Sequence, residues 1–129
     1  VGNNANALEM MRVATALRRG AGRDFLVYGR MQRPAEVAVP IREWDHNGKH
    51  HAVPAVAHCA WQAPDRRHGV ALANWTTEAQ EITVHDVRLG AQATLDLCAA
   101  VDGYRPVTLT DGQAEFTLPP LSCAILSSE

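Results

Sequence analysis

The residues with the clearest potential for chemistry form the histidine-rich segment Asp45-His-Asn-Gly-Lys-His-His51. Imidazole and carboxylate groups at this spacing could ligate zinc or nickel if the segment folded back on itself, with His46, His50 and His51 as candidate ligands. The segment has no cysteine partner, and adjacent His50 and His51 would point to opposite faces of an extended chain. We therefore expect a solvated hairpin loop and no cofactor, and a metal protein built on these histidines and His58 is kept as an alternative.

The three tryptophans, Trp44, Trp61 and Trp75, are candidates for a different chemistry. An exposed aromatic ring can stack on a sugar ring, whereas a ring within an apolar strand packs in the core. Trp61 and Trp75 lie in apolar runs, which favours core packing, and Trp44 lies beside the charged segment. Trp44 and Trp61 are the two rings whose exposure would indicate a carbohydrate-binding module.

Catalytic motifs are weak throughout the sequence. The serines near the C-terminus lack a Gly-x-Ser-x-Gly elbow, which argues against a serine hydrolase. The aspartates lie at expected turns and strand ends, where Asp is common for local hydrogen bonding. Cys59, Cys98 and Cys123 lack metal-ligand spacing and lie in apolar contexts, which predicts buried free thiols.

The second half of the chain, residues 69–127, must position any such groups. It consists of short runs rich in Val, Leu, Ile and Thr, separated by turn residues at near-regular spacing. This pattern is typical of strands in an antiparallel sandwich. The strongest local signal is Asp111-Gly112, which favours a type I′ turn and predicts a hairpin between residues 107–110 and 113–118. The inward face of the returning strand should hold Ala114, Phe116 and Leu118.

The first half begins with apolar residues at helical spacing, which predict a helix over about residues 4–19 that ends at Gly20. Residues 25–28 (FLVY) are expected to form a strand or an extended connection. Further strands are expected at residues 38–44, 53–62, 70–75, 81–87 and 93–101, with residues 70–75 in a central position because nearly all are apolar. The predicted fold is mainly β: an antiparallel β-sandwich of about seven or eight strands with one N-terminal α-helix.

Composition and charge limit the classes of partner. The chain has 129 residues, 47% of them hydrophobic, and a formal charge of −2, which fits one compact domain. Residues 1–33 contain six arginines and two acidic residues, a net charge of +4. Residues 34–129 contain six basic and twelve acidic residues, a net charge of −6. No aromatic interleaving accompanies the basic segment, so we expect it to pack on an acidic neighbour and predict no nucleic-acid partner. No apolar run reaches the roughly 18 residues of a membrane helix, so no membrane partner is expected either.

Two segments resemble a known domain. Residues 69–84 (GVALANWTTEAQEITV) are similar to a strand, Asn-Trp-Thr and turn pattern in the C-terminal β-sandwich that follows the (β/α)8 barrel of many glycoside hydrolases of the α-galactosidase and α-amylase kind. Residues 117–126 (TLPPLSCAIL) resemble the final strand of those domains. Residues 25–34 look like their linker, which would make residues 4–19 the last barrel helix. The resemblance thus divides the chain into residues 1–33, helix and linker, and residues 34–129, sandwich.

The resemblance implies a non-catalytic accessory domain that stabilises or shapes a catalytic barrel in the same parent chain. The catalytic carboxylates of those families lie on barrel strands, so no catalytic residue is transferred to this sequence. Val1 in place of Met fits a piece of a longer hydrolase. The alternative is a carbohydrate-binding module that holds an oligosaccharide on exposed aromatics, and the two differ in the exposure of Trp44 and Trp61.

Overall fold

The computed structural model describes residues 3–99 and 103–129. Its helices are α1 (Asn3–Arg19), α2 (Arg23–Leu26) and the 3-10 turn η1 (Val87–Leu89). The strands of the first half are β1 (Arg30–Gln32), β2 (Glu36–Ala38), β3 (Ile41–His46), β4 (Lys49–Pro54), β5 (Val56–Gln62) and β6 (His68–Asn74). Those of the second half are β7 (Gln80–His85), β8 (Gln92–Cys98), β9 (Gly103–Thr108), β10 (Gln113–Leu118) and β11 (Ser122–Ser128).

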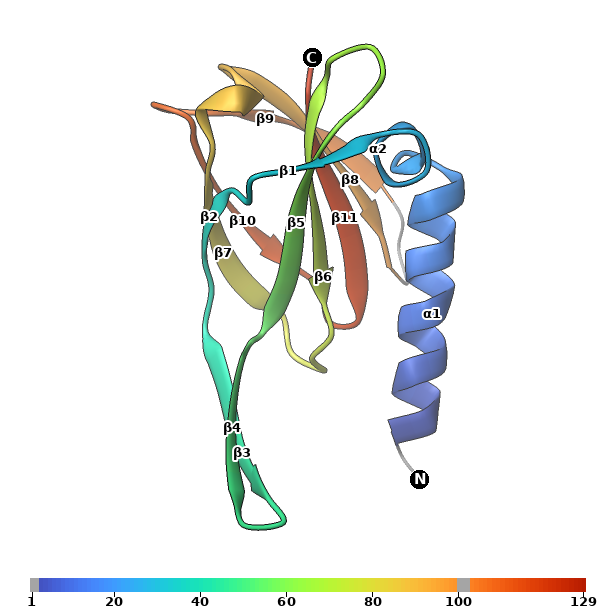
Figure 1. Ribbon diagram of the computed structural model, residues 1–129, viewed down its shortest axis with the longest axis vertical. Helices are drawn as coiled ribbons and strands as arrows, with labels where there is room; N and C mark the ends of the chain where they lie inside the picture. The colour runs from blue at the N-terminus through green and yellow to red at the C-terminus, as the bar shows by residue number, and fades with distance from the viewer. Residues whose placement is uncertain (1–2, 100–102) are drawn as a thin grey trace.

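The strands form an antiparallel β-sandwich with one projecting hairpin (Figure 1). One sheet has six strands in the order β1-β5-β6-β11-β8-β9, and the other has three in the order β10-β7-β2. β3 and β4 pair only with each other and extend away from the body, on the side where α1 begins (Figure 1). The predicted fold class is confirmed, including the central position of β6.

The main core lies between the two sheets. Alternate residues of β10 are buried, and they pack with inward residues of β6, β7 and β11. This period-two pattern is what a strand with one dry and one wet face produces. The inward-facing residues expected for β10 are confirmed: Ala114, Phe116 and Leu118.

A second core lies on the outer face of the six-stranded sheet. Val13 and Leu17 of α1 pack there with Phe25, Cys123 and Ile125, so both faces of β11 are buried. Glycine at position 69 lets the Phe25 ring pack closely on the sheet, because a Cβ atom at this position would lie 2.7 Å from Cδ1 of Phe25. The predicted helix therefore covers part of the sandwich, and among the described residues no helix is long and apolar enough to cross a membrane.

The hairpin predicted around Asp111-Gly112 is wrong in its pairing. Both residues have positive φ, 52° and 76°, as the turn signal required. However, β9 pairs with β8 in one sheet and β10 pairs with β7 in the other, and a single bridge joins Thr110 to Gln113. The tight turn thus carries the chain from one sheet to the other, because a local turn signal does not determine which strand completes each ladder.

Three other expectations needed correction. Residues 25–28 form no strand, because Phe25 lies in α2 and its ring is buried against the sheet. The run at residues 38–44 is split into β2 and β3, and that at residues 53–62 into β4 and β5, next to Pro40 and Pro54. Prolines lack the N–H donor that a continuous ladder needs, which explains both breaks and part of the excess over eight strands. The strand expected at residues 93–101 is β8, and residues 100–102 lie outside the described part of the chain.

Candidate functional site

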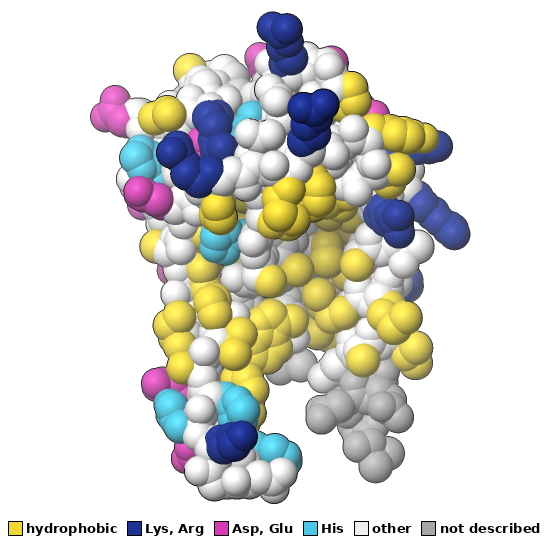
Figure 2. All heavy atoms as spheres, in the orientation of Figure 1, with side chains coloured by type: hydrophobic (Ala, Val, Ile, Leu, Met, Phe, Trp, Pro, Cys, Tyr) yellow, Lys and Arg dark blue, Asp and Glu magenta, His cyan; other side chains and the backbone are white. Residues whose placement is uncertain are grey.

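A cleft lies between α1 and the β3–β4 hairpin, with the outer face of β5 and β6 as its floor (Figure 2). We use "the cleft" for two hollows, one apolar and one aromatic. The apolar hollow, of about 220 Å³, runs along α1 and over small side chains of the sheet, among them Ala57, Ala71 and Ala73. The aromatic hollow, of about 450 Å³, lies at the base of the hairpin and is lined by Asn6, Arg42, Glu43, Trp44, Trp75, Thr76 and Thr77.

The hairpin forms because Asn47 and Gly48 both adopt positive φ, 52° and 75°, which is the geometry of a type I′ turn. The register pairs Trp44 with His51 and Asp45 with His50. Because side chains alternate along a strand, Trp44 and His51 lie on one face of the hairpin and Asp45 and His50 on the other. The turn type therefore decides which residues reach the cleft.

Trp44 belongs to an aromatic cluster with His51 and Trp75. The Trp44 ring stacks on His51 with centroids 5.3 Å apart and an interplanar angle of 18°. Its edge meets Trp75 at 6.3 Å and 67°. The indole N–H of Trp75 donates to the carbonyl of Pro54 at 2.9 Å, which fixes the ring of Trp75 against the root of the hairpin. Trp44 and Trp75 remain 43% and 37% exposed, so this cluster has a surface open to solvent.

Trp61 does not join this cluster. Its side chain is half-buried and packs against the second core, and its indole N–H donates to the Sγ atom of Cys59 at 3.0 Å. Its strand neighbour on β1 is Met31. Sequence reasoning missed Trp75, which lies just beyond β6 where its ring can turn outward; its position directly before the Thr76-Thr77 turn was the available signal.

The candidate metal ligands lie along the hairpin and do not converge. His50 contacts Asp45 through Nδ1 at 2.9 Å and Glu43 through Nε2 at 3.4 Å, all on exposed side chains. His51 stacks on Trp44 on the other face, and His46 is opposite Lys49. Within residues 3–99 and 103–129, no group of three or more His, Cys, Asp or Glu side chains is arranged to hold a metal ion.

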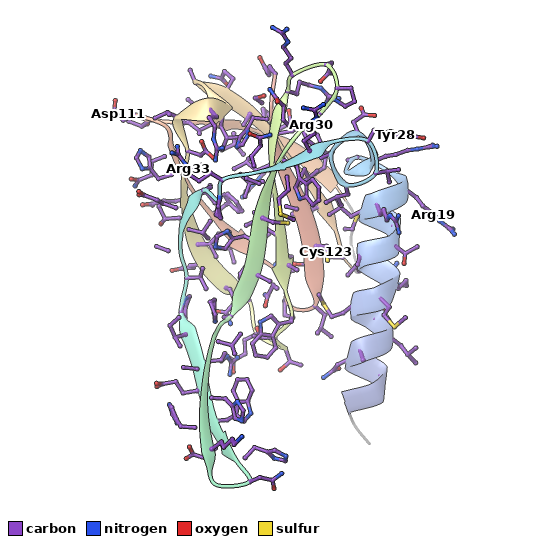
Figure 3. All side chains as sticks on the ribbon, viewed as in Figure 1. Arg19, Tyr28, Arg30, Arg33, Asp111 and Cys123 are labelled. Atoms are coloured by element: carbon purple, nitrogen blue, oxygen red, sulfur yellow. The ribbon has the colours of Figure 1, made fainter. Side chains whose placement is uncertain are left out.

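His58 and the thiols line or adjoin the apolar hollow. His58 is half-buried on β5, its Nδ1 atom has no hydrogen-bond partner, and burial lowers the pKa of its imidazole. Cys59, Cys98 and Cys123 form no disulfide with one another. Burial, with a smaller contribution from Cys98, raises the pKa of Cys123 on β11 (Figure 3) to about 11. Because the thiolate is the reactive form of cysteine, Cys123 behaves as a core residue and not as a nucleophile.

A buried ion pair lies near the start of β6, at the opposite end of the sandwich from the hairpin tip (Figure 1). Nε2 of His68 is 2.9 Å from Oδ2 of Asp86, and both side chains are buried. Burial alone would raise the pKa of Asp86, but hydrogen bonds from the side chain and backbone of Arg88 and from His68 lower this pKa to about 2. Arg88 also donates to the carbonyl of Arg33, so the group ties the linker before β2 to η1. The contacts of His68, Asp86 and Arg88 therefore hold parts of the fold together.

Asn74 closes the sandwich at the end nearer the hairpin. Its side chain is completely buried, and Nδ2 lies 2.9 Å, 3.2 Å and 2.9 Å from the carbonyl oxygens of Glu78, Leu118 and Pro119. Its Oδ1 accepts from the backbone N–H and the hydroxyl of Thr76 at 3.0 Å and 2.8 Å. One amide therefore joins the β6–β7 turn to the β10–β11 turn.

Comparison with known families agrees with this fold. The profile described as "D-apionate lactonase, C-terminal immunoglobulin-like domain" matches residues 54–126, which is more than half of the chain. The chain belongs to this family. The match begins at Pro54, so α1, α2 and most of the β3–β4 hairpin lie outside the matched region. A search of curated protein sequences finds no match.

Solved structures show the same fold in larger enzymes. CelM2, a bifunctional glucanase-xylanase protein from a metagenome library, is similar with a TM-score of 0.53 and 20% identity over 61% of this chain and 17% of that chain. A GH30 endoxylanase from Clostridium papyrosolvens C71 is similar with a TM-score of 0.51 and 15% identity over 63% of this chain and 22% of that chain. The domain is thus Ig-like and shares its fold with part of each of these enzymes, and the chain spans about a fifth of their length.

Proposed function

We propose that this chain is a non-catalytic accessory domain that packs through the apolar hollow of the cleft against a catalytic domain of the same polypeptide. The family is that of a C-terminal domain of a lactonase, and similar sandwiches make up 17% and 22% of the matched enzymes. The resemblance seen in the sequence supports a (β/α)8 barrel as the catalytic partner. The family name supports a sugar-acid lactone or a related sugar derivative as the substrate of the whole polypeptide.

The observation that carries the proposal is the uncovered apolar surface of the cleft. α1 packs over β11 and β8, and leaves the small apolar side chains of β5 and β6 partly open beside it. Figure 2 shows hydrophobic side chains gathered in this hollow and on the walls at both sides. Val53, Leu8 and Met11 are among the exposed apolar residues on the hairpin and helix. Contiguous apolar surface of this kind marks an interface in a soluble protein.

The catalytic domain is the occupant that fits the position of the cleft. α1 begins on the same side of the molecule as the hairpin tip (Figure 1), and Asn6 near its start lines the aromatic hollow. A domain that precedes α1 in the polypeptide would therefore enter beside the cleft, and a short connection keeps neighbouring units at a high effective concentration. Whether residues 4–19 also serve as the last helix of that barrel, as the sequence resemblance implies, stays a prediction.

The test places a charge on the floor of the cleft in the whole polypeptide. Ala57 is exposed on β5, so Ala57→Glu should leave the isolated sandwich folded while burying a carboxylate in the proposed interface. Ala38→Glu is the matched control, because Ala38 is also an exposed strand alanine but lies on β2 of the other sheet.

We expect calorimetry to show one cooperative unfolding transition for the wild-type polypeptide and for Ala38→Glu, and two separate transitions for Ala57→Glu. Domains that share an apolar interface stabilise each other, and loss of the interface uncouples them. Identical profiles for Ala57→Glu and wild type would show that the catalytic domain does not rest on the cleft.

A further inference from the structure

We propose that the aromatic hollow of the cleft is a binding site for a neutral sugar ring, with Trp44 as the stacking surface and Trp75 as its support. This site replaces the pair Trp44 and Trp61 expected from the sequence, because Trp61 packs against the second core. The inference does not depend on docking to a catalytic domain, since all of the residues that form the site belong to this chain.

Contacts with His51 and Trp75 fix the orientation of the Trp44 ring before a sugar binds. One face of its ring lies on His51 at 5.3 Å and its edge meets Trp75, yet 43% of the residue is exposed. Trp75 is itself fixed by its hydrogen bond to the carbonyl of Pro54. A ring whose orientation is already fixed loses little conformational entropy when a ligand binds, which is the main advantage of a preorganised site.

The polar groups around the rings match the hydroxyl groups of a sugar. The hollow is lined by an amide on Asn6, a hydroxyl on Thr77 and the guanidinium of Arg42. Nη2 of Arg42 lies 3.0 Å from Oε2 of Glu78, and the remaining N–H groups of the guanidinium are able to donate to a ligand. Sugar hydroxyls both donate and accept, so a mixed set of donors and acceptors suits them.

The charge and size of the hollow decide the class of ligand. Arg42 and Glu78 form an ion pair that adds no net charge, and Glu43 contacts His50 on the other face of the hairpin, so neither an anionic nor a cationic ligand has a clear electrostatic advantage. The volume of about 450 Å³ lies within the range of roughly 300–1,000 Å³ that is usual for small-molecule sites. Stacking on an indole favours a flat apolar ring face, which pyranose rings present.

The experiment titrates the isolated chain with a pentose and a hexose oligosaccharide, xylotriose and cellotriose, while indole N–H resonances are followed by NMR. We expect saturable shifts of the Trp44 and Trp75 signals with at least one of the two sugars, with a Kd of about 1 mM. Trp44→Ala should weaken binding at least tenfold. Ile41→Ala is the matched control, because Ile41 is an exposed apolar residue of the same strand on the opposite face.

Nuclear Overhauser contacts between sugar protons and the Trp44 ring in the wild-type protein give a second measurement that needs no variant. Two results would overturn the proposal: the absence of a saturable shift with both sugars up to about 20 mM, or unchanged affinity in Trp44→Ala. Either result leaves the docking proposal untouched, because docking is tested by the unfolding of the whole polypeptide.

Discussion

Replacing Asn74 by Asp should destabilise the domain more than the change of one atom suggests. In the wild type, Nδ2 supplies two N–H donors to a group of three carbonyl oxygens, those of Glu78, Leu118 and Pro119, in a completely buried position. The carboxylate of Asn74→Asp has no donor for them and places negative charge at about the same distances. At about 2 kcal/mol for each donor lost in a buried setting, the free energy of unfolding should fall by about 4 kcal/mol at pH 7. This is a large share of the stability of a small domain.

The pH dependence of the effect identifies its cause. Burial beside three carbonyl oxygens raises the pKa of the introduced carboxyl above its value in the unfolded chain, so the folded variant takes up a proton that the unfolded chain does not. Stability of the variant relative to wild type should therefore rise as the pH is lowered from 7 to 5, because the protonated carboxyl carries no charge and donates one hydrogen bond. The assay is urea unfolding of both proteins at the two pH values, followed by circular dichroism.

Asn47→Asp is the matched control for this substitution. Asn47 is exposed in the hairpin turn with φ of 52°, a conformation that Asp also tolerates, so its replacement should change the unfolding free energy by less than about 0.5 kcal/mol. A value for Asn74→Asp within about 0.5 kcal/mol of wild type at pH 7 would refute the reasoning, because it would mean that the amide does not hold the two turns together.

Two further predictions concern the packing of α2 and the buried ion pair. Gly69→Ala should lower the free energy of unfolding by about 1–3 kcal/mol, because its Cβ would lie 2.7 Å from the Phe25 ring, and adding Phe25→Leu should recover part of this loss in urea unfolding. Wild-type stability should fall as the pH drops through about 6.5, because burial lowers the pKa of His68 and the unfolded chain binds that proton first. It should fall again below about pH 4, because the pKa of Asp86 is lowered to about 2, and this second decrease should be smaller when Asp86→Asn is unfolded thermally over the same pH range.

The fold was largely predictable from the sequence in those strands whose pattern of apolar residues reflects which side chains are buried. The alternation of β10 indicated its inward face, and the apolar residues 70–75 indicated a central strand, because in both cases the pattern depends on the contacts that the fold makes. Asp111-Gly112 shows the limit of this reasoning. Its backbone geometry was predictable from two residues, but the partners of β9 and β10 depend on strands far away in the sequence.

The site was less predictable because it depends on two segments that the sequence separates. Trp44 could be identified beside a polar turn, but Trp75 follows an apolar strand and looked like a core residue. The turn after it was a local signal of exposure, but the orientation of its ring depends on the carbonyl of Pro54, at the root of the hairpin, which accepts its indole hydrogen bond. A single sequence carries no signal for a contact across 21 residues between a side chain and a backbone carbonyl.

Asn74, Trp75 and Thr76 connect the stability of the fold to the proposed sugar site. The buried amide of Asn74 and the hydroxyl of Thr76 fix the turn after β6, and Trp75 between them is partly exposed and meets Trp44 of the hairpin. The orientation of Trp44 therefore depends on a turn that is held from within the core. Loosening this turn should weaken the aromatic cluster even when Trp44 and Trp75 are both intact, because their edge-to-face contact requires Trp75 to stay in place. A motif that carried the family resemblance in the sequence thus acts in the structure as the link between the core and the candidate binding surface.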